Sequence, residues 1–150
     1  MKKTLAVLLI SFSSLATSAY AQGELTISKL AVNQDTKTEF HKMVVNQHLP
    51  KWVTQGGTNS QTQKVNIAGN QYLVLTSCKP HDCSSQRISV LYATATKKIA
   101  GVFSSVDEKT GNEKLQWLNI PDNLSIDGKT VLFAALTGSL DNHPDSFNFE

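Results

Sequence analysis

The chain has 150 residues, with 14 basic and 12 acidic side chains and a formal net charge of +2. Its basic residues form no run, so it lacks the clustered Lys and Arg with which proteins bind nucleic-acid phosphates. The sequence has no basic amphipathic stretch of the kind that binds a membrane surface.

The first 21 residues have the pattern of an export signal. Lys2-Lys3 is followed by a largely apolar stretch over residues 5–15 and then by Ala19-Tyr20-Ala21, which supplies small residues for cleavage. The apolar stretch is shorter than the about 20 residues that a membrane-spanning helix needs. We therefore expect residues 1–21 to be a cleaved signal peptide and residues 22–150 to form one exported domain. That domain carries 12 basic and 12 acidic residues, because the signal contains two lysines and no acid.

One helix is predicted near the start of the exported domain. Residues 22–34 are mixed and are expected to form a short arm. Thr36 and Glu39 match a capping box, in which the two side chains satisfy free backbone N–H groups at a helix start. Apolar residues follow helical spacing over residues 40–47. Leu49-Pro50 is expected to end the helix, because the residue before proline disfavours helical angles.

Short β-rich runs separated by polar turns follow this helix. Such runs with short connections predict an antiparallel meander. The expected strands are Lys64–Ile67, Tyr72–Thr76, Ile88–Tyr92, Ile99–Phe103 and Leu115–Leu118. Residues 130–137 fit either a buried strand or a helix, and their alanines and the following Gly138 favour a helix. The predicted fold class is α+β, with a single antiparallel sheet flanked by a few helices.

The segment Cys78-Lys79-Pro80-His81-Asp82-Cys83 holds the two cysteines of the chain. In an oxidising compartment two cysteines of a small protein most often pair, so we expect a Cys78–Cys83 disulfide. The bond would close a small ring at the end of two expected strands, and Pro80 would stiffen it by fixing its own φ. A closed, rigid ring of this kind is expected to protrude and suits binding better than it suits a mobile lid.

Other chemistries of this segment fit the residues less well. A redox dithiol more typically encloses two residues, and a structural zinc site needs four ligands where Cys78, His81 and Cys83 supply three at most. A catalytic His81–Asp82 pair would need a nucleophile or a substrate pocket. The residues alone leave open catalysis, a solvated surface turn and a binding loop. We expect no metal and no cofactor.

The ring segment resembles the signature loop of the Ivy family, the inhibitors of vertebrate lysozyme. Ser85-Gln86-Arg87-Ile88 after the ring extends the likeness, which covers most of residues 25–149. Further matching segments are Leu49–Val53, Gly56–Thr58, Phe103–Thr110 and Leu124–Phe147. The resemblance implies a periplasmic inhibitor and not an enzyme, with an antiparallel sheet flanked by helices and residues 22–150 as the inhibitor domain.

The resemblance also implies a mechanism centred on His81. This residue would enter the active site of a vertebrate C-type lysozyme and engage its two catalytic carboxylates, which would protect peptidoglycan from the host enzyme. Lys79 would be solvated or meet an acid, and Asp82 would orient His81 or meet a base. His41 and His48, which lack this context, are expected on the surface.

Further partners implied by the resemblance are the cell's own lytic transglycosylases and a second copy of the chain in a homodimer. A small periplasmic hydrolase or a thiol oxidoreductase that uses His81, Asp82 or the cysteines remains the alternative function.

Overall fold

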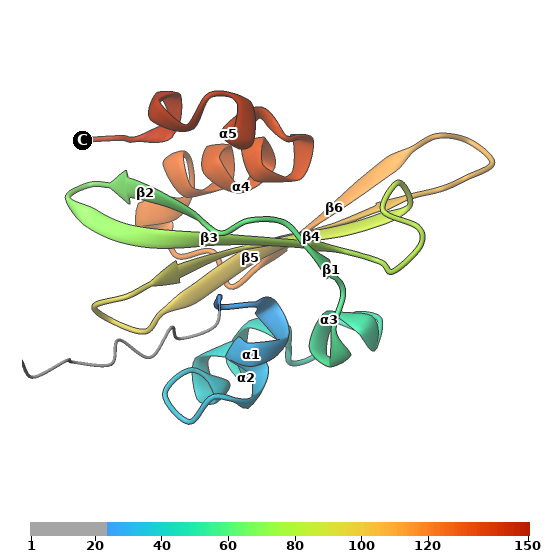
Figure 1. Cartoon of the computed structure of the whole chain (residues 1–150), viewed down its shortest axis with the longest axis horizontal. Coiled ribbons are helices and arrows are strands. Elements are labelled where there is room, and N and C mark those ends of the chain that lie inside the picture. The colour runs from blue at the N-terminus through green and yellow to red at the C-terminus, as the bar shows by residue number, and fades with distance from the viewer. Residues whose placement is uncertain (1–23) are drawn as a thin grey trace, which may run out of the picture.

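A computed structural model describes residues 24–150, and the predicted signal peptide over residues 1–21 lies outside the described residues. Figure 1 shows a central sheet with helices on both of its faces. The sheet has six strands in the order β1-β3-β4-β5-β6, with β2 also paired to β3, and every strand pair is antiparallel. The predicted α+β fold with a single antiparallel sheet is confirmed.

All five predicted strands are present, and each is longer than its sequence signal. Consecutive strands from β2 to β6 pair with one another, which is the expected meander. The shortest strand, β1, was not predicted. The strands are β1 Thr58–Asn59, β2 Gln63–Ile67, β3 Asn70–Cys78, β4 Gln86–Ala93, β5 Ile99–Val106 and β6 Glu113–Leu118.

The helices lie in two groups on opposite faces of the sheet (Figure 1). Helices α1 to α3 cover one face, and α4 and α5 cover the other. The helices are α1 Ile27–Val32, α2 Lys37–Val44, α3 Trp52–Gln55, α4 Asp127–Thr137 and α5 Ser139–Asn142, with 3-10 turns η1 Asp122–Leu124 and η2 Pro144–Phe147. None of the helices in residues 24–150 has the length and apolar character needed to span a bilayer.

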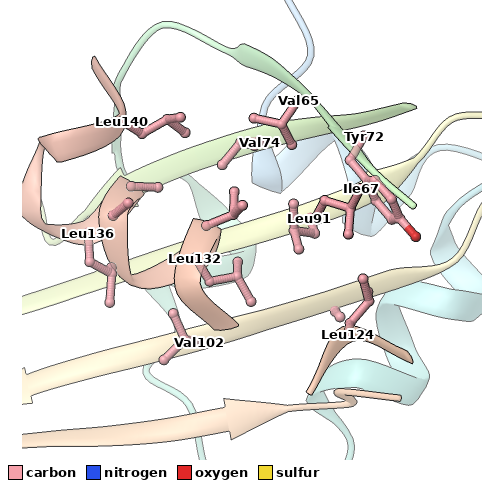
Figure 2. Close-up of a cluster of buried hydrophobic side chains, with 14 of the residues drawn as sticks. Val65, Ile67, Tyr72, Val74, Leu91, Val102, Leu124, Leu132, Leu136 and Leu140 are labelled. Atoms are coloured by element: carbon pink, nitrogen blue, oxygen red, sulfur yellow. The ribbon is translucent and has the colours of Figure 1, made fainter. Parts of the chain in front are cut away.

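Each face of the sheet has its own hydrophobic core, because successive side chains of a strand point to opposite faces. Leu30 and Met43 pack with Ile88 and Val90 on the face of α1 to α3. On the other face Leu132 of α4 belongs to a cluster that includes the strand residues Val74, Leu91 and Val102 (Figure 2). The sheet is thus fixed from both sides, which holds the ends of its strands in place.

The prediction of an arm over residues 22–34 is wrong, because residues 27–32 form α1. The Thr26 hydroxyl accepts a bond from the Lys29 amide and caps the helix. Ile27 and Leu30 are buried in the core, so tertiary packing stabilises a helix too short to persist alone.

Helix α2 begins after Thr36 as predicted, but the capping box is wrong. The Thr36 hydroxyl makes no cap bond and instead donates to the Leu30 carbonyl, at 2.7 Å. The Glu39 carboxylate accepts bonds from Lys42 and Lys98, at 2.6 and 3.2 Å. Packing of α1 against α2 therefore redirects the Thr36 side chain.

Helix α2 ends at Val44, earlier than the predicted end at Leu49-Pro50. Asn46 and His48 have φ angles of 63° and 51°, so the chain enters the left-handed region before the proline.

The helix predicted over residues 130–137 is confirmed, since residues 127–137 form a helix. Gly138 closes it with a φ of 79°, a conformation that glycine adopts without steric cost.

Candidate functional site

The ring predicted from the two cysteines closes the hairpin between β3 and β4. Cys78 is the last residue of β3, and a disulfide joins it to Cys83 with the two Cα atoms 4.8 Å apart. The Lys79 amide donates to the Gln86 carbonyl at 3.0 Å, which continues the strand pairing into the ring. The predicted disulfide and its position at the end of two strands are confirmed.

Hydrogen bonds from the ring and from the two serines that follow it converge on the carboxylate of Asp82. Its Oδ2 atom lies 2.8 Å from the Lys79 ammonium and accepts the Ser85 hydroxyl at 2.5 Å. Its Oδ1 atom accepts the Ser84 hydroxyl at 3.3 Å. The Asp82 amide also donates to the Lys79 carbonyl at 3.0 Å and closes a turn over Pro80 and His81.

These contacts set the charge state of the ring. The pKa of Asp82 is lowered to about 2, chiefly by the hydrogen bond from the Lys79 ammonium and next by that from the Ser85 hydroxyl. The hydrogen bond and charge of Asp82 raise the pKa of Lys79 in turn. Within the free protein Asp82 therefore pairs with Lys79. None of the bonds described for its carboxylate reaches His81.

His81 occupies the exposed tip of the ring. Its φ of 64° lies in the left-handed region, which costs a residue with a Cβ about 1–2 kcal/mol. No hydrogen bond or ion pair of its imidazole occurs within residues 24–150. The ring backbone thus holds in place a conformation that leaves both imidazole nitrogens available to an external partner.

The base of the ring packs closely against the segment that follows α3. Strand β1 pairs Thr58 with Cys78, and the Trp52 indole N–H donates to the Gln86 side-chain carbonyl at 2.8 Å. A Cβ on Gly57 would lie 2.6 Å from the Cys78 carbonyl, so only glycine fits there. Sequence reasoning missed these supports, although the pair Gly56-Gly57 was a signal of a close backbone approach.

No residue of the ring lines either of two cavities that lie elsewhere on the described part of the chain. One cavity of about 510 Å³ lies at the opposite end of β4, where Tyr72, Ala93 and Lys98 line it. Another of about 580 Å³ lies near the base of the ring, with Gln86 and Phe103 in its wall. His81 lines neither cavity, and within residues 24–150 no three His, Cys, Asp or Glu side chains gather as metal ligands do.

The other histidines differ from His81 in position. His41 lies in α2, His48 follows it, and His143 lies after α5. All three are exposed, which confirms the surface position predicted for His41 and His48. His81 is the histidine that the fold presents on a closed ring.

Comparison with known proteins gives a consistent family. The family model described as inhibitor of vertebrate lysozyme (Ivy) matches residues 35–136. A protein of Escherichia coli strain K12 named inhibitor of vertebrate lysozyme is 57% identical over 136 residues, which are 91% of this chain and 87% of that protein.

Two more distant relatives extend the comparison. A Pseudomonas aeruginosa protein of the same name is 30% identical over 76 residues, which are 49% of this chain and 50% of that protein. An uncharacterized Yersinia pestis protein is 30% identical over 129 residues, which are 80% and 79% of the two chains. The family match spans well over half of the sequence and includes the whole ring, so the chain belongs to the inhibitor of vertebrate lysozyme (Ivy) family.

Proposed function

We propose that the protein is a periplasmic inhibitor of vertebrate C-type lysozyme whose ring, Cys78–Cys83, inserts His81 into the active site of that enzyme. The names of the Escherichia coli and Pseudomonas aeruginosa relatives support the target. The observation that carries the mechanism is the exposed His81 at the tip of a disulfide-closed ring. The protein would act by binding and would catalyse nothing itself, while the signal peptide predicted over residues 1–21 supports the periplasmic location.

The form of the ring suits a cleft that accepts an extended sugar chain. A two-strand hairpin end is narrow, and its disulfide and turn bonds order it before any partner arrives. Ordering a flexible loop on binding costs about 0.5–1.5 kcal/mol for each immobilised side chain, so a pre-ordered ring retains more of its contact energy.

The chemistry of an imidazole matches the two carboxyl groups of a retaining lysozyme. One of them is kept protonated by an apolar pocket and the other is ionised. A neutral imidazole has one donor and one acceptor nitrogen, so His81 would donate to the ionised group and accept from the protonated one. Hydrogen bonds to a charged group are about twice as strong as neutral ones.

The ion pair within the ring removes an obstacle to this docking. A free Asp82 carboxylate beside the two lysozyme acids would repel the ionised one. Asp82 instead pairs with Lys79 at 2.8 Å and accepts two serine hydroxyls. The ring thus approaches the target with its acid compensated and its imidazole exposed.

A lysis assay tests the proposal. The chain from residue 22 onward is added to a peptidoglycan suspension with a C-type lysozyme, and turbidity is followed with wild-type protein and with the variant His81→Ala. Because central interface anchors contribute 2 kcal/mol or more, we expect the variant to inhibit at least about 30-fold less well. His41→Ala is the matched control, since His41 is exposed on another element, and it is expected to inhibit like wild type.

The outcomes separate the parts of the proposal. Undiminished lysis in the presence of excess wild-type protein would overturn the function. Equal potency of His81→Ala would overturn the mechanism but leave the target. Cleavage of peptidoglycan by the isolated protein would instead favour an enzyme.

The same assay is repeated with a lytic transglycosylase in place of lysozyme, because the sugar-binding cleft of that class of enzyme could accept the same ring.

A further inference from the structure

A polar cluster outside the ring joins four elements of the fold near the base of the ring. Arg87 of β4 donates from Nη1 to the Leu136 carbonyl in the last turn of α4, at 2.7 Å. Its Nη2 atom lies 3.5 Å from Oε1 of Glu113 in β6. The same Glu113 oxygen accepts the Ser104 hydroxyl of β5 at 2.5 Å. We call Arg87, Ser104 and Glu113 the Arg87 cluster.

The Arg87 cluster begins directly beside the ring. Arg87 pairs with Cys78 in the strand register, and the pair at Lys79 and Gln86 is hydrogen-bonded. Hydrogen-bonded and non-bonded pairs alternate, so Cys78 and Arg87 form a non-bonded pair, whose side chains are the closer ones in an antiparallel sheet. Both point to the face of α4, because Leu91, four residues after Arg87, lies in that core.

The neighbouring residue fastens the same strand from the other face. Gln86 accepts the Trp52 indole bond at 2.8 Å on the side of α3. Arg87 bonds α4 and β6 on the opposite side. Two consecutive residues at the start of β4 therefore fix the returning arm of the ring between the two helical layers.

The chemistry of Arg87 explains why arginine suits this position. A carbonyl in the last helical turn lacks an intrahelical partner, and a cation there also interacts favourably with the helix dipole. A planar guanidinium reaches this carbonyl and the Glu113 carboxylate at once, whereas a lysine ammonium is a single point. The Arg87 Nε atom is buried without a partner within the described part of the chain, a cost that an apolar side chain would avoid.

We propose that Arg87 is a positioning residue for the ring: it sets the direction in which His81 projects by fastening β4 to α4 and β6. The inhibition readout rests on the proposed function, but the positioning itself is a property of the free protein. It predicts that loss of the guanidinium loosens the ring end of the sheet more than the opposite end.

Hydrogen exchange in the free protein tests the positioning. Arg87→Met keeps an unbranched side chain and removes every donor. We expect exchange at the Lys79 amide, bonded to Gln86, to become about tenfold faster while exchange at the Ala93 amide, bonded to Lys98, changes less than about twofold. Ile99→Val is the control, since it weakens the core at the opposite end of β4, next to Tyr92. In Ile99→Val, hydrogen exchange at the Ala93 amide should be accelerated at least as much as exchange at the Lys79 amide.

Arg87→Lys is included in case Arg87→Met fails to fold, because it keeps the charge and loses only the two-pronged contact. We expect hydrogen exchange at the Lys79 amide to be accelerated less in Arg87→Lys than in Arg87→Met. Equal acceleration of exchange at the Lys79 and Ala93 amides, or none at Lys79, would overturn the positioning role.

The lysozyme assay adds a second readout. Arg87→Met should inhibit about tenfold less well than wild type, while Ile99→Val should stay within about twofold of wild type. Accelerated Lys79 exchange with unchanged inhibition would also overturn the proposal. A wild-type protein that does not inhibit lysozyme would overturn the function alone, since the exchange result still decides the role of Arg87.

Discussion

Lys79 Nζ lies 2.8 Å from Asp82 Oδ2, so an ion pair joins the residue before Pro80 to the residue after His81. The two charged residues of the ring thereby compensate each other and leave the imidazole as its exposed polar group. The pair lies within a turn that the Asp82 amide also closes, by donating to the Lys79 carbonyl. The ring is therefore held by a covalent bond at its base and by a charged contact near its tip.

The first prediction concerns acid. The pKa of Asp82 is lowered from 3.8 to about 2, first by Lys79 and then by Ser85. Because the folded-state pKa lies below the unfolded one, the stabilising contribution is complete above pH 3.8 and is lost as the pH falls through about 2. We expect the side-chain carboxyl carbon signal of Asp82 to titrate with a midpoint near 2 in an NMR experiment. A midpoint at 3.8 would contradict the ion pair.

Lys79→Met supplies the control for this titration. It removes the largest cause of the lowered pKa but leaves the Ser84 and Ser85 hydroxyls in place. The Asp82 midpoint should rise toward 3.8 without reaching it. An unchanged midpoint would mean that the serines alone hold the carboxylate in its charged form.

A second prediction concerns Gly57 beneath the ring. A Cβ at this position would lie 2.6 Å from the Cys78 carbonyl and 2.9 Å from Trp52 Cε3, and a backbone atom has little room to give way. Gly57→Ala should therefore lower the free energy of unfolding by about 1–3 kcal/mol, the range found for overpacked sites, as measured by urea denaturation.

Gly69→Asn is the comparison for Gly57→Ala. Nothing lies within 4 Å of a Cβ at Gly69, and asparagine tolerates its φ of +73°. We expect this variant to lose less than about 1 kcal/mol, since only backbone strain opposes it. A smaller loss at Gly57 than at Gly69 would refute the close approach at the base of the ring.

A third prediction separates the two roles of the disulfide. A bond that closes a loop as short as Cys78–Cys83 stabilises the fold by about 2 kcal/mol in the chain-entropy treatment. The double variant Cys78→Ser, Cys83→Ser should lose that much in urea denaturation and still fold. Inhibition should fall by at least about tenfold, because the ring must then be ordered on binding. Inhibition equal to that of wild type would show that the closed ring is not needed.

The strands and the ring could be predicted from the sequence because their signals are local. Alternating and β-branched residues over 64–67 and 88–92 specify half-buried and buried strands without reference to distant residues. The pairing of Cys78 with Cys83 needs only their number and an oxidising compartment. These features depend on neighbouring residues, and the structure confirms them.

Three of the errors lie where a distant partner decides the outcome. Thr36 has the side chain of a helix cap, but the Leu30 carbonyl of the preceding helix takes its hydroxyl. That helix itself was missed because its stability comes from burial of Ile27 and Leu30 against the sheet. The support of the ring by Trp52 was missed for the same reason, since 34 residues separate it from Gln86.

The last prediction separates the backbone role of His81 from its chemical role. With a φ of 64°, His81 occupies a region that asparagine and glycine tolerate and that β-branched residues avoid. His81→Asn and His81→Gly should keep the free energy of unfolding within about 1 kcal/mol of wild type, whereas His81→Val should lower it by about 1–2 kcal/mol. All three should inhibit lysozyme poorly, because none supplies an imidazole.

The comparison is decided by two measurements on the same proteins, urea denaturation and the lysis assay. Suppose that inhibition follows stability, so that His81→Asn inhibits like wild type and His81→Val does not. The tip would then matter only for the shape of the ring, and the hydrogen bonds proposed for the imidazole would be unnecessary. If the stable variants also lose inhibition, the loss is due to the His81 side chain itself. Their fold is kept while the two imidazole nitrogens are gone.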